Sequence, residues 1–174
     1  MGRSTIMLDD LTPNNLATFK VINSACLPTT YSDTWYNELF NAGQLSRLAF
    51  FSELPVGAIK AKLVNLSHNI PSFEVSVATQ VNSKIVPNGV YLESLAVLPS
   101  YRGYGVGSAL LDWLIAKAKE RFVHDIVLHV HVDNAQAIEW YKKKGFEQLP
   151  DVIKDYYKQQ GLLNPDACFL TLKI

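Results

Sequence analysis

Residues 95–108 have the sequence Leu95-Ala96-Val97-Leu98-Pro99-Ser100-Tyr101-Arg102-Gly103-Tyr104-Gly105-Val106-Gly107-Ser108. The pattern predicts an apolar strand over 90–98, a glycine-rich turn after Pro99 and an amphipathic helix over 106–121. Glycines permit positive φ and a close backbone approach, and a helix start offers unpaired N–H groups and a positive dipole end. Together these features predict a site for a pyrophosphate. The glycines alone are also compatible with a plain turn between strand and helix.

Two common phosphate-binding motifs are excluded by the residues that follow the glycines. A Walker loop is absent because no Gly-Lys-Ser/Thr follows them. The dinucleotide fingerprint is absent because Leu110 stands where its third glycine would fall. The remaining motif is Arg102-x-x-Gly105-x-Gly107.

The rest of the chain predicts an α/β fold with a mixed sheet. Strands are expected at 6–11, 47–51, 57–64, 90–98, 126–132 and 167–172, with a return strand starting at 145–146. Helices are expected at 14–26, from 32 or 33 to 43, at 106–121 and at 134–144. The alternation in the second half predicts a βαβ unit with parallel pairing, preceded by antiparallel elements. We expect one domain over 1–174, with a loop or hairpin insertion at 65–89.

Composition narrows the class of protein. The 174 residues are 48% hydrophobic and 18% charged, and 16 basic residues balance 16 acidic ones. A chain this apolar is not expected to be disordered, and it has no cationic excess for nucleic acid. Cys26 and Cys168 have no metal-ligand spacing, and two buried free thiols are expected. Because no apolar run is long enough to span a membrane, we expect a cytoplasmic protein that does not bind membranes.

The glycine motif belongs to a larger pattern. Arg102 to Gly107 match the Arg/Gln-x-x-Gly-x-Gly/Ala signature with which GNAT acetyltransferases bind acetyl-CoA. The preceding Leu-x-Val-x-Pro and the later Asn134-x-x-Ala137-x-x-x-Tyr141-x-x-x-Gly145-Phe146 complete that family's pattern. The chain therefore resembles the GNAT superfamily. This resemblance implies the GNAT fold, with acetyl-CoA as co-substrate in a V-shaped opening between two parallel strands.

Within the superfamily, the chain resembles the NatE-type (San-type) N-alpha-acetyltransferases. The matching segments are 8–15, 27–31, 48–51, 56–58, 128–130 and 156–158. The resemblance implies transfer of acetyl to the α-amino group of protein N-termini, mostly those that begin with Met. It also implies association with the NatA catalytic and auxiliary subunits at the ribosome.

The resemblance further implies a set of residues that bind acetyl-CoA. They are Leu95, Ala96, Val97, Arg102, Gly103, Tyr104, Gly105, Val106, Gly107, Ser108, Asn134, Ala137, Tyr141 and Lys143. Asn134 is also expected to cap its helix. Tyr141 would protonate the departing thiolate or fix the thioester, and the alternative is a half-buried aromatic residue. No metal site is expected, because His129 and His131 share a strand face but lack a third ligand.

The candidate catalytic residues are Tyr91 and His129. A period of two places Tyr91 on one strand face with Glu93, Leu95 and Val97, and His129 on another with Val127 and His131. If the two parallel strands are neighbours, Tyr91 and His129 line one cleft, as the family's Tyr/His pair does. His129, directly or through water, would be a base with a pKa near neutrality that deprotonates the acceptor amine. Tyr91 would depend on an ordered water or a shifted pKa. The alternative for His129 is a core histidine.

The acceptor site is also implied by resemblance, as a cleft roofed by two loops. Its expected residues are Leu27, Pro28, Thr29, Tyr31, Glu93, Tyr156 and Tyr157. Tyr156-Tyr157 could instead be an edge strand with one ring buried. Glu93 stands where the family is mostly apolar, so it would either draw the acceptor's ammonium or weaken preference for an apolar first residue. Leu27, Thr29 and Gln160 also depart from the family pattern.

We expect the amine to attack acetyl-CoA directly in a ternary complex. A cysteine acyl-enzyme is disfavoured because neither Cys26 nor Cys168 is expected in the cleft. Two other functions stay open at this stage. One is a weakly active or non-catalytic subunit that binds acetyl-CoA within the NatA/NatE complex. The other is a GNAT enzyme that acetylates lysines or small amines.

Overall fold

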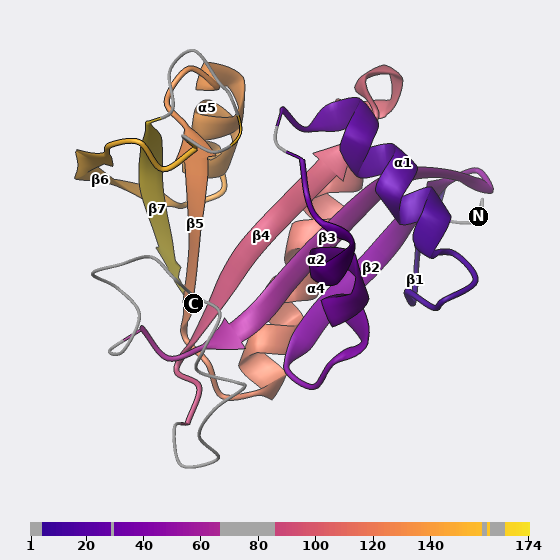
Figure 1. The fold of residues 1–174 in the computed structure, drawn as a ribbon, viewed down its shortest axis with the longest axis horizontal. Helices are drawn as coiled ribbons and strands as arrows, with labels where there is room; N and C mark the ends of the chain where they lie inside the picture. Colours follow the sequence, from indigo (N-terminus) through magenta and orange to yellow (C-terminus); the bar gives the residue numbers. More distant parts are fainter. Residues whose placement is uncertain (1–4, 29, 67–85, 158–159, 161–165) are drawn as a thin grey trace.

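The computed structural model describes residues 5–28, 30–66, 86–157, 160 and 166–174 (Figure 1). Its strands are β1 (Ile6–Asp9), β2 (Gln44–Phe51), β3 (Leu54–Val64), β4 (Gly89–Val97), β5 (Asp125–His131), β6 (Glu147–Ile153) and β7 (Ala167–Lys173). Its helices are α1 (Leu16–Cys26), α2 (Asp33–Asn37), α4 (Val106–Glu120) and α5 (Ala135–Lys143), with short 3-10 helices η1 (Glu38–Phe40) and η2 (Pro99–Tyr101). The predicted elements thus occur in the expected order.

The strands of the described residues form one seven-stranded sheet in the order β1-β2-β3-β4-β5-β7-β6. The pair β4–β5 is parallel, and the other neighbouring pairs are antiparallel. Helix α4 makes the crossover between the two parallel strands, which confirms the predicted βαβ unit. The predicted mixed sheet is also confirmed.

Apolar side chains cover both faces of this sheet. Leu110 and Leu114 of α4 are fully buried and belong to the larger core, together with Tyr141 of α5. On the opposite face, Phe19 of α1 packs in a second core with Leu48 of β2. Figure 1 shows α1 and α2 in front of the sheet and α4 behind it. The sheet is therefore the middle layer of three.

Strands β4 and β5 pair only at their beginnings. The register contains two residue pairs, Val90 with Ile126 and Tyr91 with Val127. Beyond Tyr91 the two strands separate, as Figure 1 shows. Beyond the paired residues, Leu95 to Val97 of β4 line a cavity.

Strand β4 carries a β-bulge at Glu93. Lys60 of β3 pairs with Ser94 while Ala61 pairs with Leu92, so Glu93 is the extra residue. A bulge shifts the alternation of side chains by one position. The prediction that Tyr91, Glu93, Leu95 and Val97 share one face is therefore wrong, because Leu95 and Val97 pack against the α4 core while Tyr91 lies in a separate cluster on the other face.

The ends of the segment between β3 and β4 lie together. Asn65 Nδ2 donates to the carbonyl of Val86 at 2.7 Å, and the N–H of Leu66 donates to Asn88 Oδ1 at 2.8 Å. The insertion predicted at 65–89 starts and ends at this point, but most of it lies outside the described residues. In the part of the chain that is described, no helix combines the length and apolar character needed to cross a membrane.

Candidate active site

The turn before α4 depends on two glycines in the left-handed backbone region. Gly103 has φ +84° and Gly105 has φ +90°. A Cβ added to Gly103 would meet nothing within 4 Å, so space is not the reason for this glycine. An L side chain at such a φ costs roughly 1–2 kcal/mol. Gly105 is the N-cap of the 15-residue helix α4 and has no side chain, so among the described residues no side chain caps the first N–H groups of the helix.

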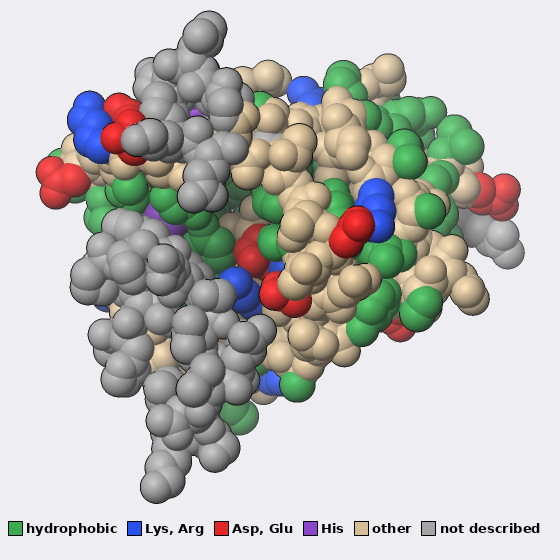
Figure 2. Space-filling view, viewed as in Figure 1, with side chains coloured by type: hydrophobic (Ala, Val, Ile, Leu, Met, Phe, Trp, Pro, Cys, Tyr) green, Lys and Arg blue, Asp and Glu red, His purple; other side chains and the backbone are tan. Residues whose placement is uncertain are grey.

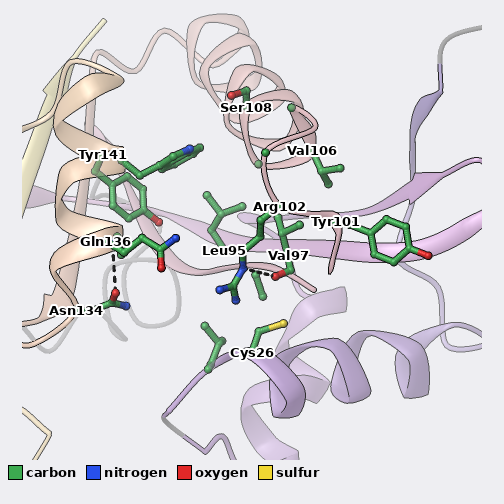
Figure 3. A pocket seen from close by; sticks show the side chains of 17 residues that line it. Cys26, Leu95, Val97, Tyr101, Arg102, Val106, Ser108, Asn134, Gln136 and Tyr141 are labelled. Carbon is green, nitrogen blue, oxygen red and sulfur yellow. Dashed lines mark hydrogen bonds between the residues drawn. The ribbon is translucent and has the colours of Figure 1, made fainter. Parts of the chain in front are cut away.

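A cavity of about 630 Å³ lies at this helix start, where β4 has separated from β5. Twelve of the residues predicted for acetyl-CoA line it: Leu95, Ala96, Val97, Arg102, Gly103, Gly105, Val106, Gly107, Ser108, Asn134, Ala137 and Tyr141. Figure 3 shows Arg102 between β4 and the start of α4, and its Nε donates to the carbonyl of Val97 at 2.9 Å. Asn134 caps α5 as predicted, accepting from the N–H of Ala137 at 3.2 Å.

Two predicted residues lie elsewhere. Tyr104 is 61% exposed and packs on Phe51, with ring centroids 5.3 Å apart. Lys143 is exposed and is not part of the cavity lining. The basic side chain that reaches the start of α4 belongs instead to Lys144, whose Nζ donates to Ser108 Oγ.

The structure adds residues that the sequence reasoning missed. Cys26, Tyr101, Gln136 and Trp140 also line the cavity, as does Leu27, which was assigned to the acceptor site. Helical spacing could have grouped two of them, because Gln136 and Trp140 are four positions apart and share one face of α5.

Cys26 corrects one expectation. It lines the cavity beside Arg102, so the prediction that neither cysteine falls in the cleft is wrong for Cys26. Cys168 is buried in the core, whereas Cys26 is only partly buried. Burial raises the pKa of the Cys26 thiol, and this outweighs the lowering by the Arg102 guanidinium. The thiol is thus protonated at neutral pH and is not a primed nucleophile.

Tyr91 and His129 lie together, as predicted from the parallel strands. Tyr91 Oη is 2.6 Å from His129 Nδ1 and 2.8 Å from Tyr156 Oη. The His129 ring stacks on Tyr156, with centroids 4.2 Å apart and planes 17° apart. Side chains from β4, β5 and the segment between β6 and β7 thus form one hydrogen-bonded chain.

Burial sets the protonation of this chain. It lowers the pKa of His129 to about 3 and raises the pKa of Tyr91 well above its ordinary value. The expectation of a His129 pKa near neutrality is therefore not met. At neutral pH the imidazole is neutral, so its Nδ1 can either accept or donate one hydrogen bond. It would hold a second proton only briefly.

His131, two positions along β5, lies beside Tyr157, with ring centroids 5.7 Å apart. Within the described ranges, no group of three or more His, Cys, Asp or Glu side chains is arranged to hold a metal ion.

Two loops meet above the Tyr91 side of the sheet. Gln160 Oε1 accepts hydrogen bonds from the N–H and the hydroxyl of Thr30, at 2.8 and 3.1 Å. Gln160 Nε2 donates to the carbonyl of Thr30 at 3.1 Å. Tyr31 stacks on Trp35 at 3.8 Å, and its hydroxyl donates to the Glu93 carbonyl at 3.4 Å. Of the other predicted acceptor residues, Pro28 is exposed and Thr29 lies outside the described residues.

The Glu93 carboxylate is not available to attract the ammonium group of an acceptor, because it is already paired with two lysines. Lys60 Nζ pairs with one carboxylate oxygen, and Lys62 Nζ lies 3.1 Å from the other. Its side chain is only 7% exposed. Glu93 is therefore neutralised within the protein.

The low pKa of His129 predicts a pH-dependent stability. The unfolded chain, with a histidine pKa of about 6.5, binds a proton between pH 6.5 and 3 that the folded protein does not bind. The free energy of unfolding therefore falls as pH falls through this window, by up to about 1.4 kcal/mol per pH unit. Urea denaturation at several pH values measures this dependence. Between pH 6.5 and 4.5, we expect the free energy of unfolding of His129→Asn to change less steeply with pH than that of the wild type. His124→Asn, at an exposed position, is the matched control. An unchanged slope for His129→Asn would contradict this account.

Comparison with known proteins finds a family and relatives that are all acetyltransferases. Residues 16–146 match the model of the acetyltransferase (GNAT) family. The chain is 32% identical to the probable N-acetyltransferase San of Drosophila melanogaster, over 91% of this chain and 77% of that protein. It is 30% identical to N-alpha-acetyltransferase 50 of Danio rerio, over 90% of this chain and 83% of that protein.

A solved structure agrees over the whole length. The Arabidopsis thaliana Naa50 structure, in complex with the bisubstrate analogue CoA-Ac-MVNAL, superposes with a TM-score of 0.80. The two are 29% identical, and the match covers 98% of this chain and 100% of that chain. On its family match, its close relatives and its fold, the chain belongs to the GNAT acetyltransferase family.

Proposed function

We propose that this protein transfers the acetyl group of acetyl-CoA to the α-amino group of protein N-termini. The observation that carries the proposal is the Tyr156–Tyr91–His129 chain, which lies beside the separation of β4 and β5 that also holds the α4 cavity. The analogue in the Arabidopsis structure joins CoA to a peptide, and this chain shares that protein's fold over 98% of its length.

The cavity fits acetyl-CoA, which supplies an acyl group activated as a thioester. The uncapped N–H groups of α4 and the positive end of its dipole would hold phosphate oxygens, and Arg102 and Lys144 add positive charge. Gly103 presents no side chain where phosphates would approach the backbone. Leu95 to Val97, on the β4 segment after the bulge, would line the pantetheine arm.

The acceptor amine would lie against the tyrosine–histidine chain. An α-amine has a pKa of about 8, so a part of it is already neutral at pH 7. The attacking nitrogen becomes strongly acidic as its bond to the acyl carbon forms, and a weakly basic partner then suffices to remove the proton. Tyr91 and His129 would receive it, directly or through water, by moving protons along their hydrogen bond.

Tyr141 has the properties of a hydrogen-bond donor to the leaving group. It lines the cavity and is 8% exposed. Burial raises the pKa of its hydroxyl above the ordinary value, so the phenol is protonated at neutral pH. It would donate its hydrogen bond to the departing thiolate or to the thioester.

The proposal extends to the cellular setting. We propose a cytoplasmic enzyme that associates with NatA catalytic and auxiliary subunits at the ribosome. Support comes from the resemblance of the chain to NatE-type enzymes and from its identity to N-alpha-acetyltransferase 50 over most of both chains.

Acetyl transfer to defined amines tests the proposed activity. The acceptors are a peptide that begins Met-Leu, the same peptide with a blocked N-terminus, a blocked peptide that contains lysine, and spermidine. We expect transfer to the free N-terminus alone, with kcat/KM rising through the pKa of the acceptor amine near 8. His129→Ala should lower kcat about 100-fold while acetyl-CoA binding is retained.

His124→Ala is the matched control and should keep wild-type turnover, because His124 is exposed, precedes β5 and is not part of the cavity lining. Transfer to lysine or spermidine but not to the free N-terminus would replace the proposed acceptor. Bound acetyl-CoA with no transfer to any of the four amines would indicate a non-catalytic subunit.

The Gln160–Thr30 hydrogen bonds join the two loops above the acceptor site, so their loss is expected to weaken binding of the acceptor peptide. Gln160→Leu removes three hydrogen bonds between the two loops without a large change in volume. We expect the KM for the peptide to rise about three- to tenfold, with kcat and the KM for acetyl-CoA nearly unchanged. Gln148→Leu is the control, because Gln148 lies on β6 and contacts Cys168. An unchanged peptide KM, or an equal rise in the KM for acetyl-CoA, would count against this role.

A further inference from the structure

Three charged side chains form a buried cluster next to the tyrosine–histidine chain. The side chains of Lys60, Lys62 and Glu93 are 0%, 10% and 7% exposed. Lys60 Nζ pairs with Glu93 Oε2, and Lys62 Nζ is 3.1 Å from Glu93 Oε1. One carboxylate is thus shared by two ammonium groups. We call these residues the Lys60–Lys62–Glu93 cluster.

The cluster lies on the acceptor side of the sheet. Lys62 is paired with Tyr91 in the β3–β4 register, and the carbonyl of Glu93 accepts from Tyr31. Figure 2 shows acidic and basic atoms together on the floor of a hollow near the centre of the view, over the middle of the sheet. A peptide whose amine reaches Tyr91 would pass beside these charges.

The charges in the cluster do not balance. Lys60 has two close partners, the Glu93 carboxylate and the ring of Trp35, whose centroid is 4.3 Å from Nζ. Burial lowers the pKa of the Lys60 ammonium group, while the Glu93 carboxylate raises it and Glu38, half-buried on η1, raises it from longer range. Within the described residues, the ion pair of Lys62 is with Glu93 alone. The neighbouring Tyr91 and Tyr156 are uncharged, since burial raises the pKa of each.

A purely structural role explains this arrangement poorly. A buried ion pair stabilises a fold little compared with apolar side chains of the same volume. One lysine is enough to neutralise Glu93, and a second buried ammonium group is unfavourable unless a further anion approaches it. The second ammonium group therefore indicates a binding site for an anionic ligand.

We propose that the Lys60–Lys62–Glu93 cluster selects acceptor N-termini that carry a carboxylate side chain within their first two residues. An acceptor carboxylate near Lys62 Nζ would give two anions for two cations. An apolar side chain in the same place would lie against an unbalanced ion cluster, which is unfavourable. This inference rests on the proposed N-terminal acetyltransferase function and narrows its substrate class.

Matched peptides test the inference. Acetyl transfer is measured for peptides that begin Met-Leu, Met-Gln, Met-Glu and Glu-Leu and are otherwise identical. We expect kcat/KM for Met-Glu or Glu-Leu to exceed that for Met-Gln and Met-Leu about tenfold in the wild type. Lys62→Met should reduce this ratio to about one, and Lys62→Arg should keep most of it. Lys119→Met, at an exposed position on α4, should leave the ratio unchanged.

Two results would overturn the inference. One is a wild-type preference for Met-Leu over both acidic peptides, and the other is an acidic preference that survives in folded Lys62→Met. Thermal unfolding and acetyl-CoA binding establish that each variant is folded, and Lys62→Gln replaces Lys62→Met if the latter does not fold. If no peptide is acetylated, the proposed function fails. The affinities of the same peptides for the CoA-loaded protein then test the inference. Tighter binding of the acidic peptides that is lost in Lys62→Met would support it, and equal binding of all four peptides would contradict it.

Discussion

The limited pairing between β4 and β5 is the constraint on which the site depends. The two strands share two residue pairs, at Val90 and Tyr91, and then separate. The paired part holds Tyr91 close enough to β5 for its hydroxyl to reach His129. The separated part frees Leu95 to Val97 to line the cavity at the start of α4. One feature of the sheet thus supports both halves of a two-substrate reaction.

The bulge at Glu93 divides β4 between these two tasks. Before the bulge, Tyr91 forms part of the tyrosine–histidine chain, and after it Leu95 and Val97 pack toward α4. The bulged residue is itself charged and is held by Lys60 and Lys62. Bulges beside active sites commonly re-aim side chains. Here the bulge also places a buried ion cluster beside the proposed path of the acceptor peptide.

Much of the fold and the donor side of the site could be predicted from local sequence. Gly103 and Gly105 act through their left-handed backbone conformation, so their consequences are local and visible in the sequence. The acceptor side depends on long-range geometry. The alternation of side chains along 90–98 could not reveal the bulge, which comes from pairing with β3. Nor could it reveal that Glu93 is neutralised, or that Cys26, some 75 residues from Arg102, lies beside it. The low pKa of His129 likewise follows from burial by distant segments.

The most direct test of the account is a crystal structure of this protein with CoA joined through an acetyl group to the α-amine of an acceptor peptide. The account predicts phosphate groups on the N–H groups of Val106 to Ser108. It predicts the amide nitrogen within hydrogen-bond distance of Tyr91 or His129, directly or through one water, with the peptide between the loops of Tyr31 and Tyr156. A conjugate bound with its amide nitrogen away from Tyr91 and His129 would contradict the account.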